Sequence, residues 1–369
     1  MSGGEDPPDT LDLMRGWDGA AVVVRHDEPT GTWMFVALHD DTLGRPTGGC
    51  RMKVYGSPGE GLRDAQRLAA GMTRKWAAID LPFGGGKAVL AVPRLLEGRE
   101  REGLLRRFAG LLDSLHGACG TGEDLGTSPA DMHFLAGLTE HVMGADPVTG
   151  EPIDPGPWTA LGVFHGMRAA LDARTGSASL EGRRVLVEGV GDVGAPLARM
   201  VAEEGGRLLL ADLRPERARS VAEALGGRVV SPSDVIGTEC DVYAPCAVGA
   251  TLTRESIPRL RCLVVAGSAN NQLERAEDAD RLHERGILYA PDYVANAGGA
   301  MAFGLVMLGE RDEEVLRRRV TGLGDALADI FREAEEEEES PLTAARRRVE
   351  RVLGRAREAR RSQAGGRAG

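Results

Sequence analysis

The chain has almost no lysine. Only Lys53, Lys75 and Lys87 occur in a Lys+Arg total of 45, and all the other basic residues are arginine. Arginine stays charged at any working pH, whereas a lysine amine can lose its proton when it is desolvated or placed beside another cation. Lys75 and Lys87 are therefore candidate functional residues. The alternative is that both are ordinary surface cations.

Long apolar runs and patterns of metal or disulfide sites are also missing. No apolar run approaches the roughly 20 residues of a membrane span, and the first residues are acidic where a signal peptide would be basic and then apolar. The net charge of −11 argues against a nucleic-acid partner. The five cysteines form no C-x-x-C pair, and the seven histidines show no metal-ligand spacing. We expect a cytoplasmic protein with reduced thiols, no metal and no membrane contact.

A length of 369 residues is too great for one ordinary core and predicts two domains. Residues 1–11 have the composition of a disordered start, and the Pro-, Gly- and Asp-rich stretch 146–158 is typical of a connection between domains. Between them the patterns predict a strand hairpin, a loop, a helix, a glycine loop, a strand and a second helix. These segments are 20–26 with 32–39, 44–51, 61–78, 84–86, 87–92 and 103–116.

Two lysines and an acidic pair form a candidate site. Lys75 lies near the end of the helix at 61–78, and Lys87 follows a triple glycine that lets backbone and ligand approach closely. Two amines could thus meet one small anionic molecule. In TGEDLGT (121–127), the adjacent carboxylates Glu123 and Asp124 cannot point the same way, so at most one faces a site. Asp124 could instead only cap a helix or turn.

The second domain opens with a dinucleotide-binding pattern. An apolar strand at 185–187 precedes Gly189, Gly191 and Gly194 in a G-x-G-x-x-G run, and a helix follows. The next apolar strand ends at Asp212. The strand, the glycine turn, the helix and the acidic residue are together the complete dinucleotide-binding fingerprint. The Asp212 carboxylate would bind ribose hydroxyls and repel a 2′-phosphate, so NAD is favoured over NADP, although Arg214 lies close by.

Further strands predict a doubly wound parallel sheet, and a charged tail follows it. Apolar segments at 241–244, 263–266 and 287–290 are spaced as such a sheet requires. After Phe303 come a helical pattern at 311–331, an acidic run at 333–339 and an arginine-rich helical stretch at 341–361. Because the acidic and basic stretches adjoin, we expect a solvated or mutually paired tail rather than a nucleic-acid or membrane patch.

Five short motifs resemble the glutamate/leucine/phenylalanine/valine dehydrogenase family. They are GGCRM (48–52), GMTRK ending at Lys75, GGGK ending at Lys87, TGEDLGT (121–127) and NAGG (296–299), and they occur in the family's order and spacing. The resemblance runs from about Val22 to about Phe303. It is nearest to the dehydrogenases of branched-chain and aromatic amino acids.

The resemblance implies an α/β fold with two domains. Residues 1–145 would form a substrate-binding and oligomerisation domain, on which part of 332–369 packs back, and 156–331 a Rossmann-like NAD-binding domain. The expected reaction is the reversible oxidative deamination of an apolar L-amino acid, aromatic or branched-chain, to a 2-oxo acid and ammonia. Relatives form assemblies, so a homo-oligomer is expected.

The resemblance also implies roles for single residues. Lys75 would hold the substrate carboxylate, Lys87 and Asp124 would transfer protons, and closure of the domains would exclude water. Gly48 and Gly49 would contact the carboxylate end of the substrate, and Asn296 would face it. The cofactor-binding residues would be Thr159, Gly189, Gly191, Asp192, Val193, Gly194, Asp212, Ala247 and Asn271.

Four positions would line the pocket for the substrate side chain: Thr47, Gly122, Ala300 and Phe303. None is a cation, which argues against a substrate with a γ-carboxylate. Gly122 and Ala300 enlarge the pocket, Phe303 fills part of it, and Thr47 adds a hydroxyl. Because Thr47 and Phe303 depart from the family's usual choices, a biosynthetic enzyme that uses an unusual amino or oxo acid, or condenses a 2-oxo acid, stays open. A non-catalytic NAD-binding regulator is the remaining alternative.

Overall fold

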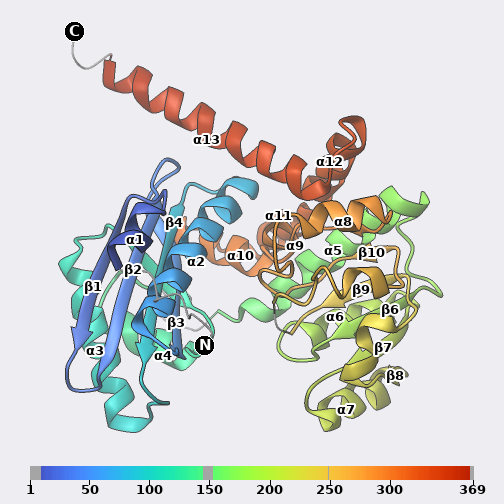
Figure 1. Ribbon diagram of the computed structural model, residues 1–369, viewed down its shortest axis with the longest axis horizontal. Coiled ribbons are helices and arrows are strands. Elements are labelled where there is room, and N and C mark those ends of the chain that lie inside the picture. Colours follow the sequence, from blue (N-terminus) through green and yellow to red (C-terminus); the bar gives the residue numbers. More distant parts are fainter. Residues whose placement is uncertain (1–9, 144–152, 248, 366–369) are drawn as a thin grey trace, which may run out of the picture. The chain divides into compact units, whose positions relative to one another are not determined.

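The computed structural model describes residues 10–143, 153–247 and 249–365 and divides into two compact units (Figure 1). Unit 1 comprises Met1–Ile153 and Val352–Gly369, and unit 2 comprises Asp154–Arg351. Most of the predicted disordered start and of the predicted connection at 146–158 lies outside the described residues. The end of that connection is helical, because helix α5 begins at Pro155.

Unit 1 is built on a five-stranded mixed sheet in the order β1-β2-β4-β3-β5. The predicted hairpin is confirmed, since β1 and β2 pair antiparallel from Ala21↔Leu38 to Asp27↔Thr32. Strand β4 then pairs antiparallel with β2 and parallel with β3, and β3 pairs parallel with β5. The strands are β1 (Ala21–Asp27), β2 (Thr32–Asp40), β3 (Pro46–Val54), β4 (Gly84–Val92) and β5 (Gly120–Glu123).

Helices cover both faces of this sheet. Helix α2 (Pro58–Ala78) begins at the N-cap Ser57 and packs on one face, where Phe35, Leu62 and Val89 are buried together. On the other face, Leu90 packs with residues of α3 (Gly98–Ser114) and α4 (Pro129–Ala136). Val89 and Leu90 point to opposite faces because side chains alternate along a strand. This explains why every residue of β4 is buried.

Two segments predicted as loops, 44–51 and 84–86, are largely strand, and both predictions were wrong. Residues 46–51 open β3, and the triple glycine opens β4. The glycines serve close packing between elements. A Cβ at Gly85 would lie 1.9 Å from Thr73 Oγ1 and 2.5 Å from the Ala69 carbonyl oxygen of α2. Glycine thus lets the helix and the sheet approach more closely than any side chain permits.

Unit 2 contains a six-stranded, fully parallel sheet in the order β11-β10-β9-β6-β7-β8. The chain order runs outward from β6 in both directions, which is the doubly wound arrangement predicted from the sequence. Its switch point lies between β6 and β9. The strands are β6 (Arg184–Glu188), β7 (Arg207–Ala211), β8 (Arg228–Val229), β9 (Val242–Pro245), β10 (Val264–Val265) and β11 (Leu288–Tyr289).

The remaining helices lie mainly in unit 2, where α5 packs against α10 and α12. Their bounds are α1 (Thr10–Arg15, in unit 1), α5 (Pro155–Thr175), α6 (Gly194–Glu203), α7 (Pro215–Leu225), the 3-10 helices η1 (Pro232–Gly237) and η2 (Ile257–Arg259), α8 (Asp278–Glu284), α9 (Asp292–Ala295), α10 (Gly298–Met307), α11 (Glu313–Thr321), α12 (Leu323–Glu336) and α13 (Pro341–Gly365).

The arginine-rich tail is helix α13, and several of its arginines form ion pairs. In the part that belongs to unit 2, Arg351 bonds Glu333 at 2.6 Å. In the part that belongs to unit 1, Arg357 bonds Asp40 at 2.8 Å and Arg360 lies 3.1 Å from Asp41. Within the described ranges, no helix has the length and apolar character needed to cross a membrane.

The packing role of Gly85 is testable by two alanine substitutions. Gly85→Ala forces a methyl group against α2, and we expect it to lower the free energy of unfolding by about 1–3 kcal/mol. Gly110 lies exposed in α3 with nothing within 4 Å of its Cβ position. Gly110→Ala should therefore raise stability by about 0.5–1 kcal/mol. Urea unfolding of both variants measures these changes, and equal effects would contradict the packing role.

Candidate active site

Lys87 and Asp124 form a buried ion pair in unit 1. Lys87 lies on the central strand β4, and Asp124 follows directly after β5. Lys87 Nζ is 3.2 Å from Asp124 Oδ1, and the two side chains are 6% and 15% exposed. A Cβ at Gly49 of β3 would lie 3.1 Å from Lys87 Nζ and 2.8 Å from Asp124 Cβ. Any side chain at position 49 would therefore collide with the pair, and glycine lets both charged groups lie against the backbone of β3.

Arg51 is a member of this cluster that the sequence analysis missed. Its Nε donates to Asp124 Oδ2 at 2.7 Å, and its second donor group bonds Asp64 Oδ2 at 3.0 Å. The Tyr55 hydroxyl donates to the same Asp64 oxygen at 2.7 Å, and Arg67 bonds the other oxygen at 2.6 Å. The available signal was its place two residues after Gly49, which puts it on the same strand face.

Burial and neighbouring charges shift the pKa values of both members of the pair. Burial raises the pKa of Asp124, but Lys87 and Arg51 outweigh it and bring that pKa to about 2. Burial lowers the pKa of Lys87, and the nearby Arg51 cation lowers it further, while Asp124 opposes both. Asp124 is therefore a fixed anion at working pH, and the Lys87 amine can give up its proton at a lower pH than an exposed lysine.

The other predicted substrate residues of unit 1 lie around the start of β3. Trp76, which follows Lys75 in α2, donates through Nε1 to the Thr47 carbonyl at 2.8 Å. Thr47 is 1% exposed, and its hydroxyl donates to the Arg45 carbonyl at 2.9 Å. A Cβ at Gly48 would touch Met72 Cγ at 3.0 Å. The half-buried Lys75 is thus held on the helix turn that packs against Thr47 and Gly48.

Gly122, the remaining predicted pocket position of unit 1, lies on β5 opposite Gly49. A Cβ at position 122 would lie 3.3 Å from the Met143 carbonyl oxygen and 3.6 Å from Met143 Cβ. The nearest side chain is therefore apolar. The structure brings all the predicted substrate residues of unit 1 to one end of β3, β4 and β5.

The glycine turn of unit 2 has the geometry of a nucleotide cradle. Gly189 has φ +91°, and a Cβ there would lie 2.8 Å from Ala247 Cβ. A Cβ at Gly194, where α6 begins, would lie 1.8 Å from the Gly189 carbonyl oxygen. Gly191, in contrast, faces open space, with its nearest neighbour 3.9 Å away. The first and third glycines thus serve tight packing, and the second leaves room for a pyrophosphate.

Asp212 is held at the end of β7 beside this turn. Its Oδ2 accepts from the Val190 amide at 3.0 Å, and its Oδ1 accepts from the Arg214 amide at 2.9 Å. Asp192 is exposed, and Val193 is the N-cap of α6. The carboxylate therefore occupies the position where the fingerprint places the ribose contact.

The loops after the last three strands carry the other predicted contacts. Ala247 and Asn271 are exposed, and Asn271 has φ +53°. Asn296 is buried, and its Nδ2 donates to the Ser268 carbonyl at 3.1 Å and to Asn270 Oδ1 at 2.9 Å. Within the described part of the chain, its Oδ1 has no hydrogen-bond partner. An acceptor in this state needs a donor, and a bound ligand would supply one.

The last three predicted residues lie on α5 and α10 of unit 2. The Thr159 hydroxyl accepts from the Gly299 amide at 3.2 Å, which ties the two helices together. Ala300 is half-buried and Phe303 is 9% exposed. Being three residues apart, they lie on one face of α10.

Comparison with known proteins gives the family. Residues 22–141 match the model of the Glu/Leu/Phe/Val dehydrogenase dimerisation domain, and residues 208–360 match that of Glutamate/Leucine/Phenylalanine/Valine dehydrogenase. Leucine dehydrogenase of Geobacillus stearothermophilus is 40% identical over 94% of each chain. Phenylalanine dehydrogenase of Thermoactinomyces intermedius is 36% identical over 92% of this chain and 93% of the relative. The crystal structure of L-tryptophan dehydrogenase from Nostoc punctiforme matches with a TM-score of 0.79 and 35% identity over 94% of this chain and 99% of that one.

The chain therefore belongs to the Glu/Leu/Phe/Val dehydrogenase family, as its motifs predicted. It is an amino acid dehydrogenase, an oxidoreductase that acts on CH–NH₂ donors with a nicotinamide cofactor. The open space at Gly191 and the unpartnered Asn296 oxygen are consistent with such a cofactor and its substrate.

The Arg51 cluster makes a prediction about stability and pH. Arg51→Gln leaves Asp124 and Asp64 short of a buried cation, and we expect a loss of about 3 kcal/mol in the free energy of unfolding at pH 7. The folded-state pKa of Asp124 lies below its ordinary 3.8. The stabilisation is therefore complete above about pH 4 and is lost as the pH falls toward about 2.

Urea unfolding of the wild type and the variant at pH 7, 5 and about 2.5 measures this difference. Arg94→Gln is a matched control, because Arg94 pairs with Glu100 on the surface and its loss should change little. A constant difference at all three pH values would contradict the assignment of the effect to the buried carboxylates.

Proposed function

We propose that this enzyme catalyses the reversible NAD-dependent oxidative deamination of an apolar L-amino acid, aromatic or branched-chain. The amino acid, NAD⁺ and water give the 2-oxo acid, ammonium, NADH and a proton. The observation that carries the proposal is the buried Lys87–Asp124 pair, in which a proton donor and a proton acceptor lie 3.2 Å apart beside Gly49. The names of the similar proteins, which are leucine, phenylalanine and tryptophan dehydrogenases, support it.

Lys75 and Asp124 would act on the amino acid before hydride transfer. Lys75 would hold the substrate carboxylate as a fixed cation at the end of α2. Asp124, ionised at working pH, would take a proton from the substrate ammonium, because an amine with a free electron pair can expel hydride from its Cα. Arg51 would keep the carboxylate in place whenever Lys87 is neutral. The nicotinamide, when bound, would accept the hydride.

Lys87 would act on the imine that follows. Its amine, with a lowered pKa, would take a proton from water as the water adds to the imine carbon. As a cation it would then stabilise the oxygen of the carbinolamine and of the product carbonyl. Asp124 would return its proton to the leaving amine. Groups of this kind each contribute roughly 10²–10⁴ in rate.

The pocket residues support an apolar substrate side chain. None of Thr47, Gly122, Ala300 and Phe303 offers a cation for a second carboxylate. The Thr47 hydroxyl already donates its hydrogen bond to the Arg45 carbonyl, so this donor is used within the protein. Met143 beside Gly122 and the buried Phe303 are apolar. Differences of a methylene or two change discrimination by only about 1–3 kcal/mol, so activity on several apolar acids is expected.

The proposal also covers assembly and location. The match of residues 22–141 to a dimerisation domain supports a homo-oligomer. The five free cysteines, of which Cys50, Cys119 and Cys240 are buried, support a reducing cytoplasm.

The first experiment is NADH oxidation with a panel of 2-oxo acids, each with and without ammonium. The panel contains phenylpyruvate, indolepyruvate, 4-methyl-2-oxopentanoate, 3-methyl-2-oxobutanoate and 2-oxoglutarate. We expect ammonium-dependent turnover on the four apolar acids and little on 2-oxoglutarate. Turnover on 2-oxoglutarate alone, or NADH binding without any turnover, would refute the substrate class.

Lys87→Arg and Asp124→Asn should each lower kcat by about 10²-fold or more, because a permanently charged or neutral group cannot exchange protons. NADH binding, followed by fluorescence, should persist in both variants. Lys53→Arg is the matched control, since Lys53 is exposed and stacks its charge over Tyr55. A near-normal kcat in Lys87→Arg or Asp124→Asn would contradict the proton-transfer role proposed for that residue.

Asp212 tests the choice of NAD. Asp212→Ser removes the carboxylate fixed beside the glycine turn, so the KM for NADH should rise about tenfold while NADPH is used better than by the wild type. Steady-state kinetics with both cofactors measure the change. Asp280→Ser, at an exposed acid of α8, should leave both values unchanged. A wild type that prefers NADPH would overturn the proposal.

A further inference from the structure

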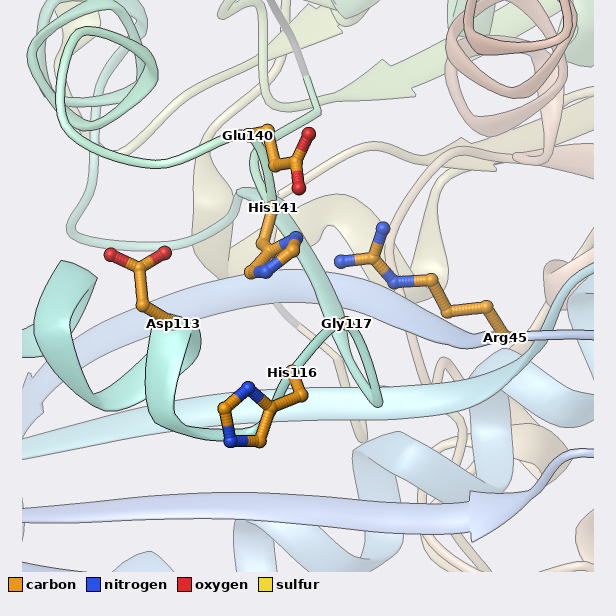
Figure 2. A pocket seen from close by; sticks show the side chains of 6 residues that line it. All are labelled: Arg45, Asp113, His116, Gly117, Glu140 and His141. Atoms are coloured by element: carbon orange, nitrogen blue, oxygen red, sulfur yellow. The ribbon is translucent and has the colours of Figure 1, made fainter.

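A pocket of about 650 Å³ lies in unit 1, and none of its lining residues is among those predicted for the active site (Figure 2). Every side chain that lines it is charged or polar, apart from one glycine. The lining residues are Arg45, Asp113, His116, Gly117, Glu140 and His141. We propose that this pocket binds a free polar amino acid as a zwitterion and that the bound amino acid acts as an effector of the dehydrogenase.

One part of the pocket offers unsatisfied nitrogen atoms. Arg45 donates through one terminal nitrogen to the Cys119 carbonyl, which fixes its guanidinium. Its Nε is buried, and neither this atom nor the buried His141 Nδ1 has a hydrogen-bond partner among the residues that the structure describes. Figure 2 shows the guanidinium pointing toward the His141 ring. Buried nitrogens without partners are uncommon, and a carboxylate would satisfy both of these.

The other part of the pocket offers carboxylates. Asp113 accepts a hydrogen bond from the Thr139 hydroxyl through Oδ1 only, which leaves Oδ2 for another donor. Glu140 carries a second carboxylate, which lies near enough to Arg45 to oppose the lowering of the Arg45 pKa by burial. Among the described residues, no His, Cys, Asp or Glu group could hold a metal ion. An ammonium group is the cation that suits these acids.

A ligand with a carboxylate and an ammonium group on one carbon suits both parts at once. A simple anion would meet the two acids, and a simple cation would meet Arg45, so each alone is disfavoured by like charge. An amino acid satisfies both. The polar lining, and above all His116, favours a polar side chain over the apolar ones expected at the Lys87 site.

Hydrogen bonds connect this pocket to all three strands of the active site. The Arg45 carbonyl accepts from the Thr47 hydroxyl of β3 and from the Gly84 amide of β4, both at 2.9 Å. The His141 carbonyl accepts from the Thr121 amide of β5, also at 2.9 Å. Strand β3 carries Gly49, strand β4 carries Lys87, and strand β5 leads directly to Asp124. A ligand that fixes Arg45 and His141 therefore fixes the starts of the strands on which the reaction depends.

The expected consequence is a coupling between effector and substrate. A ligand that orders the strand starts should change the KM for the 2-oxo acid by about 3-fold or more, and the substrate should change effector affinity by the same factor. The proposal concerns the amino acid dehydrogenase activity of the family and does not depend on which apolar substrate is used.

The test uses L-glutamine as the probe, with acetate and methylammonium as half-ligands. We expect 20 mM L-glutamine to raise the thermal midpoint of the wild type by about 2 °C or more and to change the KM, while neither half-ligand does so. Arg45→Gln should lose both responses and keep the basal turnover. Arg63→Gln, an exposed arginine of α2, is the matched control and should respond like the wild type.

Three outcomes would overturn the proposal. An equal response in Arg45→Gln would place L-glutamine elsewhere, for example in the substrate site. No response of the wild type to L-glutamine would remove the effector. A changed oligomeric state of Arg45→Gln in light scattering, without any response to L-glutamine, would make the pocket a contact between subunits. If basal turnover were absent from the wild type, the proposed function would fail, while the thermal shift would still report on the pocket.

Discussion

The structure of unit 1 depends on one electrostatic arrangement, a carboxylate held between two buried cations. Asp124 alone would be costly to bury as an anion, and Lys87 alone would lose its proton. Lys87 and Arg51 together keep Asp124 ionised in a place from which water is largely excluded, and Asp124 in turn opposes the loss of the Lys87 proton. Arg51 also donates to Asp64, which in turn accepts hydrogen bonds from Tyr55 and Arg67. The chemistry is thus carried by a cluster that extends from the centre of the sheet to the surface.

A second constraint is the absence of side chains around that cluster. Gly49 lets Lys87 and Asp124 lie against the backbone of β3, and Gly85 and Gly86 let α2 and β3 pack tightly against β4. In unit 2, Gly189 and Gly194 close the turn so that Gly191 alone remains open. The same residue type thus has two different uses. Most of these glycines bring protein against protein, and only a few leave room for a ligand.

The sequence predicted the fold class, the doubly wound sheet and the family, because apolar periodicity and short motifs reflect local geometry. It failed where tertiary pairing overrides local preference. Segments 44–51 and 84–86 are rich in glycine and proline, yet they pair as parallel strands, since their glycines are needed by neighbours distant in the chain. Arg51 was missed for a related reason. Its role depends on partners 13 and 73 residues away, which no local pattern reveals.

The scarcity of lysine has a practical side. Lys87 is buried on the central strand of the sheet, and Lys75 is half-buried on α2. Lys53 alone among the three lysines is exposed, with its ammonium group over the Tyr55 ring. Amine-directed chemistry, such as coupling to a support or to a dye, would therefore meet one exposed lysine side chain. Although the protein has 45 Lys and Arg residues, amine-directed labelling should favour one position, Lys53, which lies on the same strand as Gly49 and Arg51.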